Sequence, residues 1–201
     1  MHELNLLNQK RYAVTAWFYD ILDNPWQLQY RKWRPELLAD VSGEVLEADV
    51  GTGRNLRHYP PPVNLTALDF SPAMLRKATM LSRTASCKVW FVHEDATRME
   101  SVPSGSCDWV VAFFLCSVVP RELQDHAIRE FAWGLKPGGK SRLLEIRKRQ
   151  DRFAPFVEQV YGAQFDRHTL THVQNNQDLS VTGTRYVTHD TYLLIDGTRK
   201  E

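Results

Sequence analysis

The chain has 201 residues, of which 43% are hydrophobic and 24% are charged, and this length and balance are typical of one globular domain with a substantial core. Twenty-five basic and 24 acidic residues give a formal net charge of +1, so the overall charge argues against a protein that binds nucleic acid or another polyanion. We therefore expect residues 1–201 to form a single domain.

The cysteine content and the hydropathy of the chain indicate the cellular compartment of the protein. Cys87, Cys107 and Cys116 form an odd set without a CxxC pair, which favours reduced thiols over a disulfide framework or a thiolate metal site. No hydrophobic run approaches the roughly 20 residues that span a bilayer, and the first residues lack the pattern of a secretory signal. We expect a cytoplasmic protein, at most peripherally attached to a membrane.

Residues 1–41 are predicted to form a helical cap. Apolar residues recur at spacings of three and four between residues 10 and 41, and Asn24-Pro25 interrupts them, which indicates two amphipathic helices joined by a turn. Such helices would cover the core. Because Lys and Arg are interleaved with aromatic residues, the segment could also lie at a membrane interface or close over a lipid-like substrate.

Residues 45–146 alternate between strand-like and helical patterns. Strands are expected at 45–50, 65–69, 89–92, 109–116 and 141–146, and helices after Ser71-Pro72 and over 123–135. The run at 109–116 lacks polar alternation, which suits a central parallel strand buried on both faces. The alternation of strands and helices predicts a mostly parallel sheet in a doubly wound α/β fold.

Residues 147–201 form the predicted C-terminal segment. A short helix is expected at 167–174, and strands at 179–187 and 191–195 are separated by only three residues. Because so short a connection joins antiparallel strands, these two should form a hairpin at the edge of the sheet. The total is then seven strands.

Polar residues and glycines gather where the predicted parallel strands end. Gly51-Thr52-Gly53 follows the first strand, Asp69 ends the second and Asp95-Ala96 follows the third. Ligands of open parallel sheets bind beyond these strand ends, where the turn and helix N-terminus present N–H groups. A carboxylate at the end of the second strand can accept both hydrogen bonds of a ribose diol. The ligand is therefore predicted to contain a nucleoside.

The turn lacks the signatures of a pyrophosphate site. The third glycine of G-x-G-x-x-G is absent at its required spacing, and no G-x-x-x-x-G-K-[ST] loop occurs. A cofactor with a pyrophosphate is therefore disfavoured.

Four ordered motifs resemble the class I S-adenosylmethionine-dependent methyltransferases. They are Val-Leu-Glu-x-x-x-Gly-Thr-Gly at 45–53, Leu-Asp-Phe-Ser-Pro-x-Met-Leu at 68–75, Glu-Asp-Ala at 94–96 and Leu-Lys-Pro-Gly-Gly at 135–139. The resemblance implies a Rossmann-like sheet with an antiparallel C-terminal hairpin, an N-terminal helical cover and S-adenosylmethionine as cofactor.

Further segments resemble one branch of that class. Residues 19–20, 74–78, 115–118 and 144–145 are similar to the ubiquinone/menaquinone methyltransferases and the bacterial phosphatidylethanolamine N-methyltransferases, and the tail at 165–170 is similar to lipid and thiol methyltransferases. The resemblance implies a lipid-associated acceptor, either a phospholipid amine or a quinone ring. A soluble thiol or another small metabolite is the alternative.

When the family's binding residues are transferred to the matching positions of this sequence, the resemblance first implies contacts to the methionine and ribose portions of the cofactor. Glu47 would orient the methionine ammonium, directly or through water. Gly51 and Gly53 would pass close to the methionine and ribose, and Asp69 would hold the ribose hydroxyls.

The resemblance places the remaining contacts around the adenine and the methyl group. Phe70 or Met74 would lie along the ring, Asp95 would accept from its exocyclic amine, and the Ala96 N–H would bond a ring nitrogen. Beneath the methyl donor the implied residues are Leu115 and Cys116.

Asp49 departs from the family's Gly-x-Gly-x-Gly loop because it occupies the first glycine position. A side chain is unfavourable there if the position needs a positive φ, although Asp tolerates the left-handed region better than most residues. Its carboxylate could pair with the cofactor's ammonium or sulfonium charge. We expect weakened but real cofactor binding, and the alternative is a degenerate fold that acts as a binding module.

Methyl transfer from a sulfonium is an in-line displacement that requires no dedicated catalytic residue. Amine and thiol acceptors still lose a proton, and a ring carbon needs a base. The candidate proton acceptors are Tyr19, Glu145 and His168, followed by Asp20 and Tyr161. His168 and His172 stand at a helical i, i+4 spacing, but no third ligand is identifiable, so no metal site is predicted.

Overall fold

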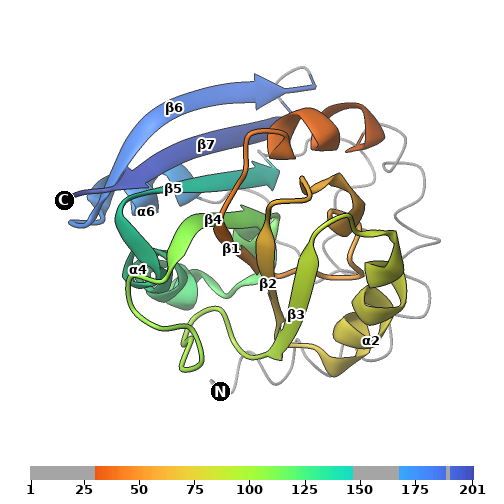
Figure 1. Ribbon diagram of the computed structural model, residues 1–201. Helices are drawn as coiled ribbons and strands as arrows, with labels where there is room; N and C mark the ends of the chain where they lie inside the picture. The colour runs from red at the N-terminus through yellow and green to blue at the C-terminus, as the bar shows by residue number, and fades with distance from the viewer. Residues whose placement is uncertain (1–29, 147–167, 189–190) are drawn as a thin grey trace.

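The computed structural model describes residues 30–146, 168–188 and 191–201, which build a seven-stranded sheet with helices on both faces (Figure 1). The strands are β1 Glu44–Ala48, β2 Asn64–Asp69, β3 Lys88–His93, β4 Cys107–Phe113, β5 Leu135–Ile146, β6 Leu179–Val187 and β7 Tyr192–Arg199. Their order is β3-β2-β1-β4-β5-β7-β6.

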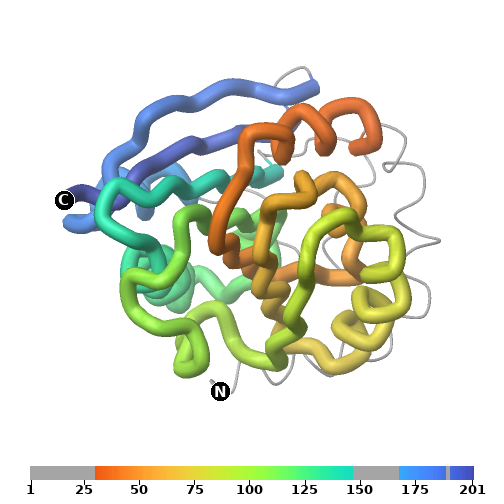
Figure 2. Tube along the Cα trace, in the orientation of Figure 1, coloured from red at the N-terminus to blue at the C-terminus, as the bar shows by residue number. Residues whose placement is uncertain are grey.

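The first five strands are parallel, and β7 runs antiparallel to both β5 and β6. The C-terminal pair β6 and β7 lies at the opposite side of the sheet from β3 (Figure 2). This topology confirms the predicted mostly parallel α/β fold with an antiparallel C-terminal hairpin.

The helices after residue 38 are α2 Pro72–Leu81, α3 Leu115–Val118, α4 Gln124–Gly134 and α6 Thr169–Asn175, with short 3-10 turns at Leu56–His58, Ser82–Thr84 and Arg121–Leu123. Helix α2 begins as predicted, because Pro72 takes the first helical position and the Ser71 side chain accepts a hydrogen bond from the Met74 N–H.

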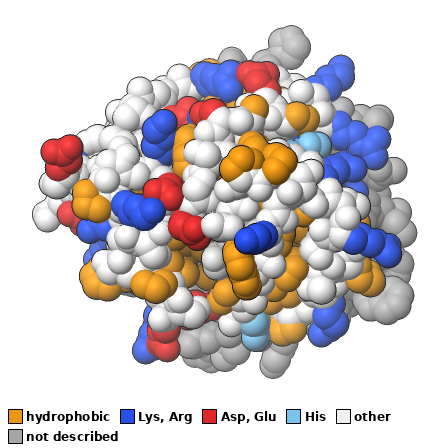
Figure 3. All heavy atoms as spheres, in the orientation of Figure 1, with side chains coloured by type: hydrophobic (Ala, Val, Ile, Leu, Met, Phe, Trp, Pro, Cys, Tyr) orange, Lys and Arg blue, Asp and Glu red, His pale blue; other side chains and the backbone are white. Residues whose placement is uncertain are grey.

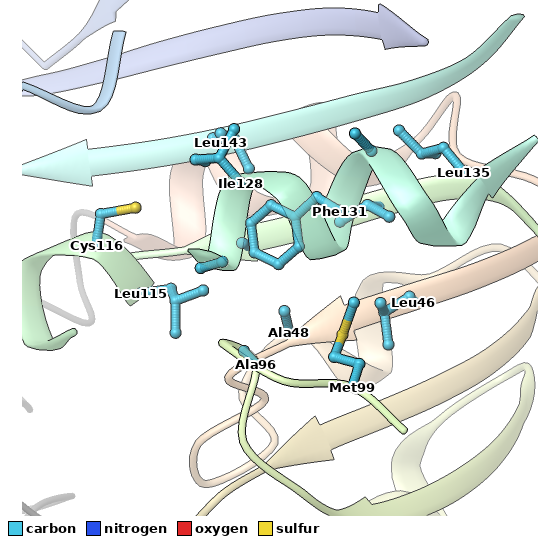
Figure 4. Packing of buried hydrophobic residues seen from close by; sticks show 14 of the residues in the cluster. Leu46, Ala48, Ala96, Met99, Leu115, Cys116, Ile128, Phe131, Leu135 and Leu143 are labelled. Atoms are coloured by element: carbon cyan, nitrogen blue, oxygen red, sulfur yellow. The ribbon is translucent and has the colours of Figure 1, made fainter. Parts of the chain in front are cut away.

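Alternate residues of the central strands enter two separate cores. Leu46 and Val110 pack with α4 and α6, and the close-up shows Phe131 and Ile128 of α4 against the strands (Figure 4). Val45 and Trp109 face the other way, toward α2 and the helix at 30–38. Burial of both faces explains why the central strands are hydrophobic without alternation.

The helix at 30–38 covers the second core. Its Tyr30, Trp33, Leu37 and Leu38 are buried, and its C-terminal end is fixed by Arg142 of β5, whose Nη1 donates to the Leu37 carbonyl at 2.7 Å. This part of the predicted N-terminal cap is therefore a core cover. Residues 1–29 lie outside the described ranges, so the rest of the cap and its membrane alternative stay predictions.

Three strand boundaries differ from those predicted by three residues or more, and one of them is the end of β7, which lies at Arg199 rather than at 195. The hydrophobic run expected as a strand to Cys116 ends at Phe113, and Phe114 has a φ of 71° and turns the chain into α3. Hydrophobicity alone does not separate a buried strand from the buried helix that follows it. β5 begins at Leu135 rather than 141, because Leu135 already pairs with Cys107 before an irregularity in the β4–β5 register.

Charged side chains of both signs lie on the face of the molecule that Figure 3 shows. Basic and acidic side chains share the face in Figure 3 with hydrophobic ones, and the large exposed hydrophobic residues are Met80, Trp90, Trp133 and Tyr186. Among the described helices, none is both long and apolar enough to cross a membrane.

Candidate functional site

A hollow lies beyond the carboxyl ends of the central parallel strands, which is where open parallel sheets bind their ligands. Its lining comes from the loop after β1, the end of β2, the segment after β3 and helix α3. The lining residues are Asp49, Leu68, Asp69, Phe70, Asp95, Ala96, Leu115, Val118 and Val119.

The loop after β1 adopts the left-handed region at three positions. Asp49, Gly51 and Gly53 have φ values of 65°, 57° and 82°. A Cβ on Gly53 would lie 2.9 Å from the Ala78 Cα of α2, whereas a Cβ on Gly51 would meet nothing within 4 Å. Gly53 is therefore required for packing, and Gly51 leaves open space beside the loop that a ligand can approach.

Asp69 ties this loop to the start of α2. Its Oδ2 accepts a hydrogen bond from the Gly51 N–H and its Oδ1 accepts one from the Ser71 N–H, each at 2.8 Å. Burial raises the pKa of Asp69 to about 6, although both backbone N–H groups pull it down. The predicted ribose-binding carboxylate is thus held rigidly at the end of β2.

Asp49 and Asp69 form a pair of like groups. Burial, the nearby Asp69 charge and a hydrogen bond between the two carboxyl groups raise the pKa of Asp49 well above its usual range. Two carboxyl groups in such contact hold a proton between them unless a cation replaces it.

Glu47 lies on β1 beneath the loop and is only 2% exposed. Its Oε1 accepts from the Asn55 side chain at 2.8 Å, and the buried Tyr59 side chain interacts with the same carboxyl group. Burial raises the pKa of Glu47 to about 7. The role predicted for Glu47 toward the methionine ammonium stays a prediction.

The adenine side of the predicted site is assembled by the segments after β2 and β3. The Asp95 Oδ1 accepts from the Thr97 N–H at 2.9 Å and from its hydroxyl at 2.7 Å, which fixes the turn that presents Ala96. Met74 is buried against Phe70 and Val118. Phe70, Asp95 and Ala96 thus line the hollow, whereas Met74 lies among the residues packed against it.

Helix α3 lines one side of the hollow, where the methyl donor is predicted to lie, and is held by Glu145. The Glu145 carboxylate accepts from the Cys116 N–H at 2.8 Å, the Ser117 N–H at 3.2 Å and the Ser117 hydroxyl at 2.9 Å. Burial raises the pKa of Glu145 to about 7. Leu115 lines the hollow, whereas Cys116 lies buried in α3 and is bonded through its carbonyl by Gln124.

Sequence reasoning missed Val118 and Val119. Both belong to or follow α3 and line the hollow. The expectation of a strand to residue 116 hid this short helix, and the sequence signal that remained was the apolar Val118-Val119 pair before Pro120.

Within the described residues, the remaining predicted proton acceptor is His168, and it does not line the hollow. His168 is exposed at the start of α6, and the His172 Nδ1 pairs with the Asp125 Oδ1 at 2.5 Å. Tyr19, Asp20 and Tyr161 lie outside the described residues. Within the described ranges no group of three or more His, Cys, Asp or Glu could hold a metal ion.

The charge of the hollow suits a positively charged nucleoside. Three of its nine lining residues are carboxylates, namely Asp49, Asp69 and Asp95, and none of the nine is basic. A pyrophosphate would meet repulsion here, whereas ribose hydroxyls, an amine or a sulfonium would find acceptors. The residues present therefore fit a cationic nucleoside cofactor.

Residues 45–139 match a family model described as a methyltransferase domain. Over 153 residues the chain is 28% identical to a ubiquinone/menaquinone biosynthesis C-methyltransferase from Syntrophotalea carbinolica, covering 71% of this chain and 60% of the relative. Over 99 residues it is 35% identical to a phosphatidylethanolamine N-methyltransferase from Cereibacter sphaeroides, covering 49% of this chain and 48% of the relative. The chain thus spans about half to three-fifths of the length of these relatives.

The fold is also that of a solved methyltransferase. The N-methyltransferase NodS from Bradyrhizobium japonicum, crystallised with S-adenosyl-L-homocysteine, superposes with a TM-score of 0.70 at 17% identity, covering 89% of this chain and 93% of that one. A human thiol S-methyltransferase is a third relative by sequence. It is 34% identical over 113 residues, covering 53% of this chain and 45% of the relative. Residues 45–139 thus match the methyltransferase domain that the sequence motifs indicated.

Proposed function

Because the chain carries a class I S-adenosylmethionine-dependent methyltransferase domain, we propose that it transfers a methyl group to a lipid-associated small molecule, either a phospholipid amine or a quinone ring. The observation that carries the proposal is the hollow with three carboxylates and no basic lining residue at the ends of the parallel strands. A cationic nucleoside donor without phosphate groups is complementary to it.

The cofactor would be held by the strand ends. Asp69 would accept from the ribose hydroxyls, Asp95 would accept from the adenine amine, and the Ala96 N–H would donate to the ring. The open space at Gly51 would admit the methionine and ribose portion beside the backbone. Glu47, buried on β1, would attract the ammonium from beneath the loop.

When bound, the cofactor supplies a methyl group already activated by a sulfonium. The protein then chiefly has to align the acceptor with the methyl carbon and exclude water from the reacting groups. Leu115, Val118 and Val119 present an apolar wall that excludes water from the reacting side. Glu145 acts as a positioning residue, since both of its oxygens hold the first N–H groups of α3.

The acceptor class is supported by the relatives. One acts in quinone biosynthesis and the other is named for phosphatidylethanolamine. Residues 1–29, with Trp17, Phe18, Trp26, Lys10 and Arg11, provide the segment through which we propose peripheral membrane contact.

A second acceptor class is favoured by the human thiol methyltransferase match, whose identity of 34% is close to the 35% of the phospholipid enzyme. The two classes separate in a transfer assay with donor labelled on the methyl group. Incorporation into phosphatidylethanolamine vesicles or a demethylated quinone in detergent supports the lipid acceptor. Incorporation only into soluble thiols replaces it, and cofactor binding without transfer to any acceptor indicates a binding module.

A further inference from the structure

Asp49 is the residue at which this site departs from its family, and it lies in the hollow itself. Its backbone has a φ of 65°, so the loop keeps the conformation that a glycine would adopt and adds a carboxylate to the lining. The added group therefore changes the charge of the site while its backbone path is retained.

The carboxylate meets no positive partner in the lining. It lines the hollow together with Asp69, whose two oxygens accept from the Gly51 and Ser71 N–H groups. Glu47 on β1 adds negative potential, Asp95 faces the hollow from the segment after β3, and α3 contributes only apolar residues there. The counter-charge must come from a proton or from the ligand.

We infer that Asp49 makes this pocket select the positively charged sulfonium cofactor over the neutral thioether left after methyl transfer, an inference that rests on the function proposed above. Transfer breaks the bond between sulfur and the methyl carbon, a new bond forms from that carbon to the acceptor, and the electron pair stays on sulfur, which becomes neutral. A bound sulfonium brings a positive charge to a lining that holds Asp49, Asp69 and Asp95 and no basic residue, whereas the thioether brings none at that atom.

A preference for the positively charged ligand gives a function to Asp49, which stands where the family has a glycine. The ammonium is common to donor and product, so only the group at sulfur distinguishes them electrostatically. A carboxylate that favours the charged form weakens product retention after each turnover. Asp49 is then a specificity residue rather than a sign of a degenerate site.

Calorimetric titration of three ligands tests the inference. These are S-adenosylmethionine, S-adenosylhomocysteine, and sinefungin, in which a carbon bearing an ammonium replaces the methylated sulfur. Wild type should bind both cationic ligands at least about tenfold more tightly than S-adenosylhomocysteine, and Asp49→Asn should reduce that preference by about tenfold. Asp49→Gly, which restores the family residue and suits the positive φ, should behave like Asp49→Asn.

The ratio within one protein is insensitive to a general loss of folding, because both ligands need the same fold. The inference is overturned if wild type binds S-adenosylhomocysteine as tightly as sinefungin, or if the preference is unchanged in both variants. Failure of wild type to bind any of the three ligands overturns the proposed function and this inference with it.

Discussion

Glu47 couples the stability of the protein to pH. Burial raises the pKa of Glu47 from 4.5 to about 7, so the folded protein holds the proton more tightly than the unfolded chain does. Its contribution to the free energy of unfolding is therefore full below about pH 4.5 and is lost as the pH rises through about 7. The shift corresponds to roughly 3 kcal/mol.

Glu47→Gln should flatten this dependence. Without a carboxyl group at position 47, the ligand-free variant should lose less stability than wild type between pH 5 and pH 8, by roughly 2–3 kcal/mol. Urea unfolding at both pH values measures the difference. Glu122→Gln is the matched control because Glu122 is exposed. An identical pH dependence in wild type and Glu47→Gln would contradict the burial account.

The variant Glu145→Gln distinguishes whether Glu145 positions α3 or accepts a proton from the methyl acceptor. In Glu145→Gln the side-chain amide would place a donor against the N–H groups of Cys116 and Ser117, which should lower the free energy of unfolding by about 1–3 kcal/mol. If Glu145 only positions α3, kcat falls but the pH profile keeps its shape. Disappearance of an ionisation near pH 7 from the kcat profile would instead identify Glu145 as the proton acceptor.

The individual side chains of the site were predictable to different degrees. Asp69, Asp95 and Ala96 follow directly from strand ends, so their place in the hollow was foreseeable. The contact between Asp49 and Asp69 was not, because it depends on how the loop after β1 folds back on the end of β2. The same holds for Glu145, whose partners are 28 and 29 residues away along the chain.

At the scale of elements, the loop between β1 and the 3-10 turn at Leu56–His58 contains two glycines, Gly51 and Gly53, that can be compared directly. Gly53→Ala should lower the free energy of unfolding by roughly 2–5 kcal/mol, because its Cβ collides with α2 in addition to straining a positive φ. Gly51→Ala should lower it by only about 1–2 kcal/mol, since its Cβ enters open space.

The same Gly51→Ala variant should bind S-adenosylmethionine at least about tenfold more weakly, because the methyl group occupies space needed by the ligand. Urea unfolding and calorimetry on the two variants measure both effects. Equal stability of the two variants would contradict the packing role of Gly53, and unchanged affinity of Gly51→Ala would contradict the approach of a ligand at this loop.

The ends of the strands and helices depend on backbone conformations and distant contacts that a local pattern of hydrophobic residues does not predict. The strand at 109–116 was predicted too long because Phe114 takes a left-handed conformation, which few non-glycine residues adopt. Its ring packs against Tyr30 and Tyr192, from the helix at 30–38 and from β7. That conformation is thus supported by contacts that are distant in sequence.

At the scale of the whole molecule, the order of the sheet accounts for the site. β1 lies between β2 and β4, so the loop after β1 meets the end of β2 on one side and α3, which follows β4, on the other. The repeating pattern of strands and helices was enough to predict this arrangement. The acceptor was beyond the sequence, because the segments predicted to meet it at 1–41 and 147–201 carry no comparable motif.

The central claim is that the hollow binds S-adenosylmethionine and rejects a pyrophosphate cofactor. Calorimetric titration of S-adenosylmethionine and of NAD⁺ into the wild-type chain at pH 7.5 tests it directly. We predict saturable binding of S-adenosylmethionine at one site per chain and no binding of NAD⁺ at the same concentrations. Binding of NAD⁺, or no binding of S-adenosylmethionine at millimolar concentration, would contradict the account.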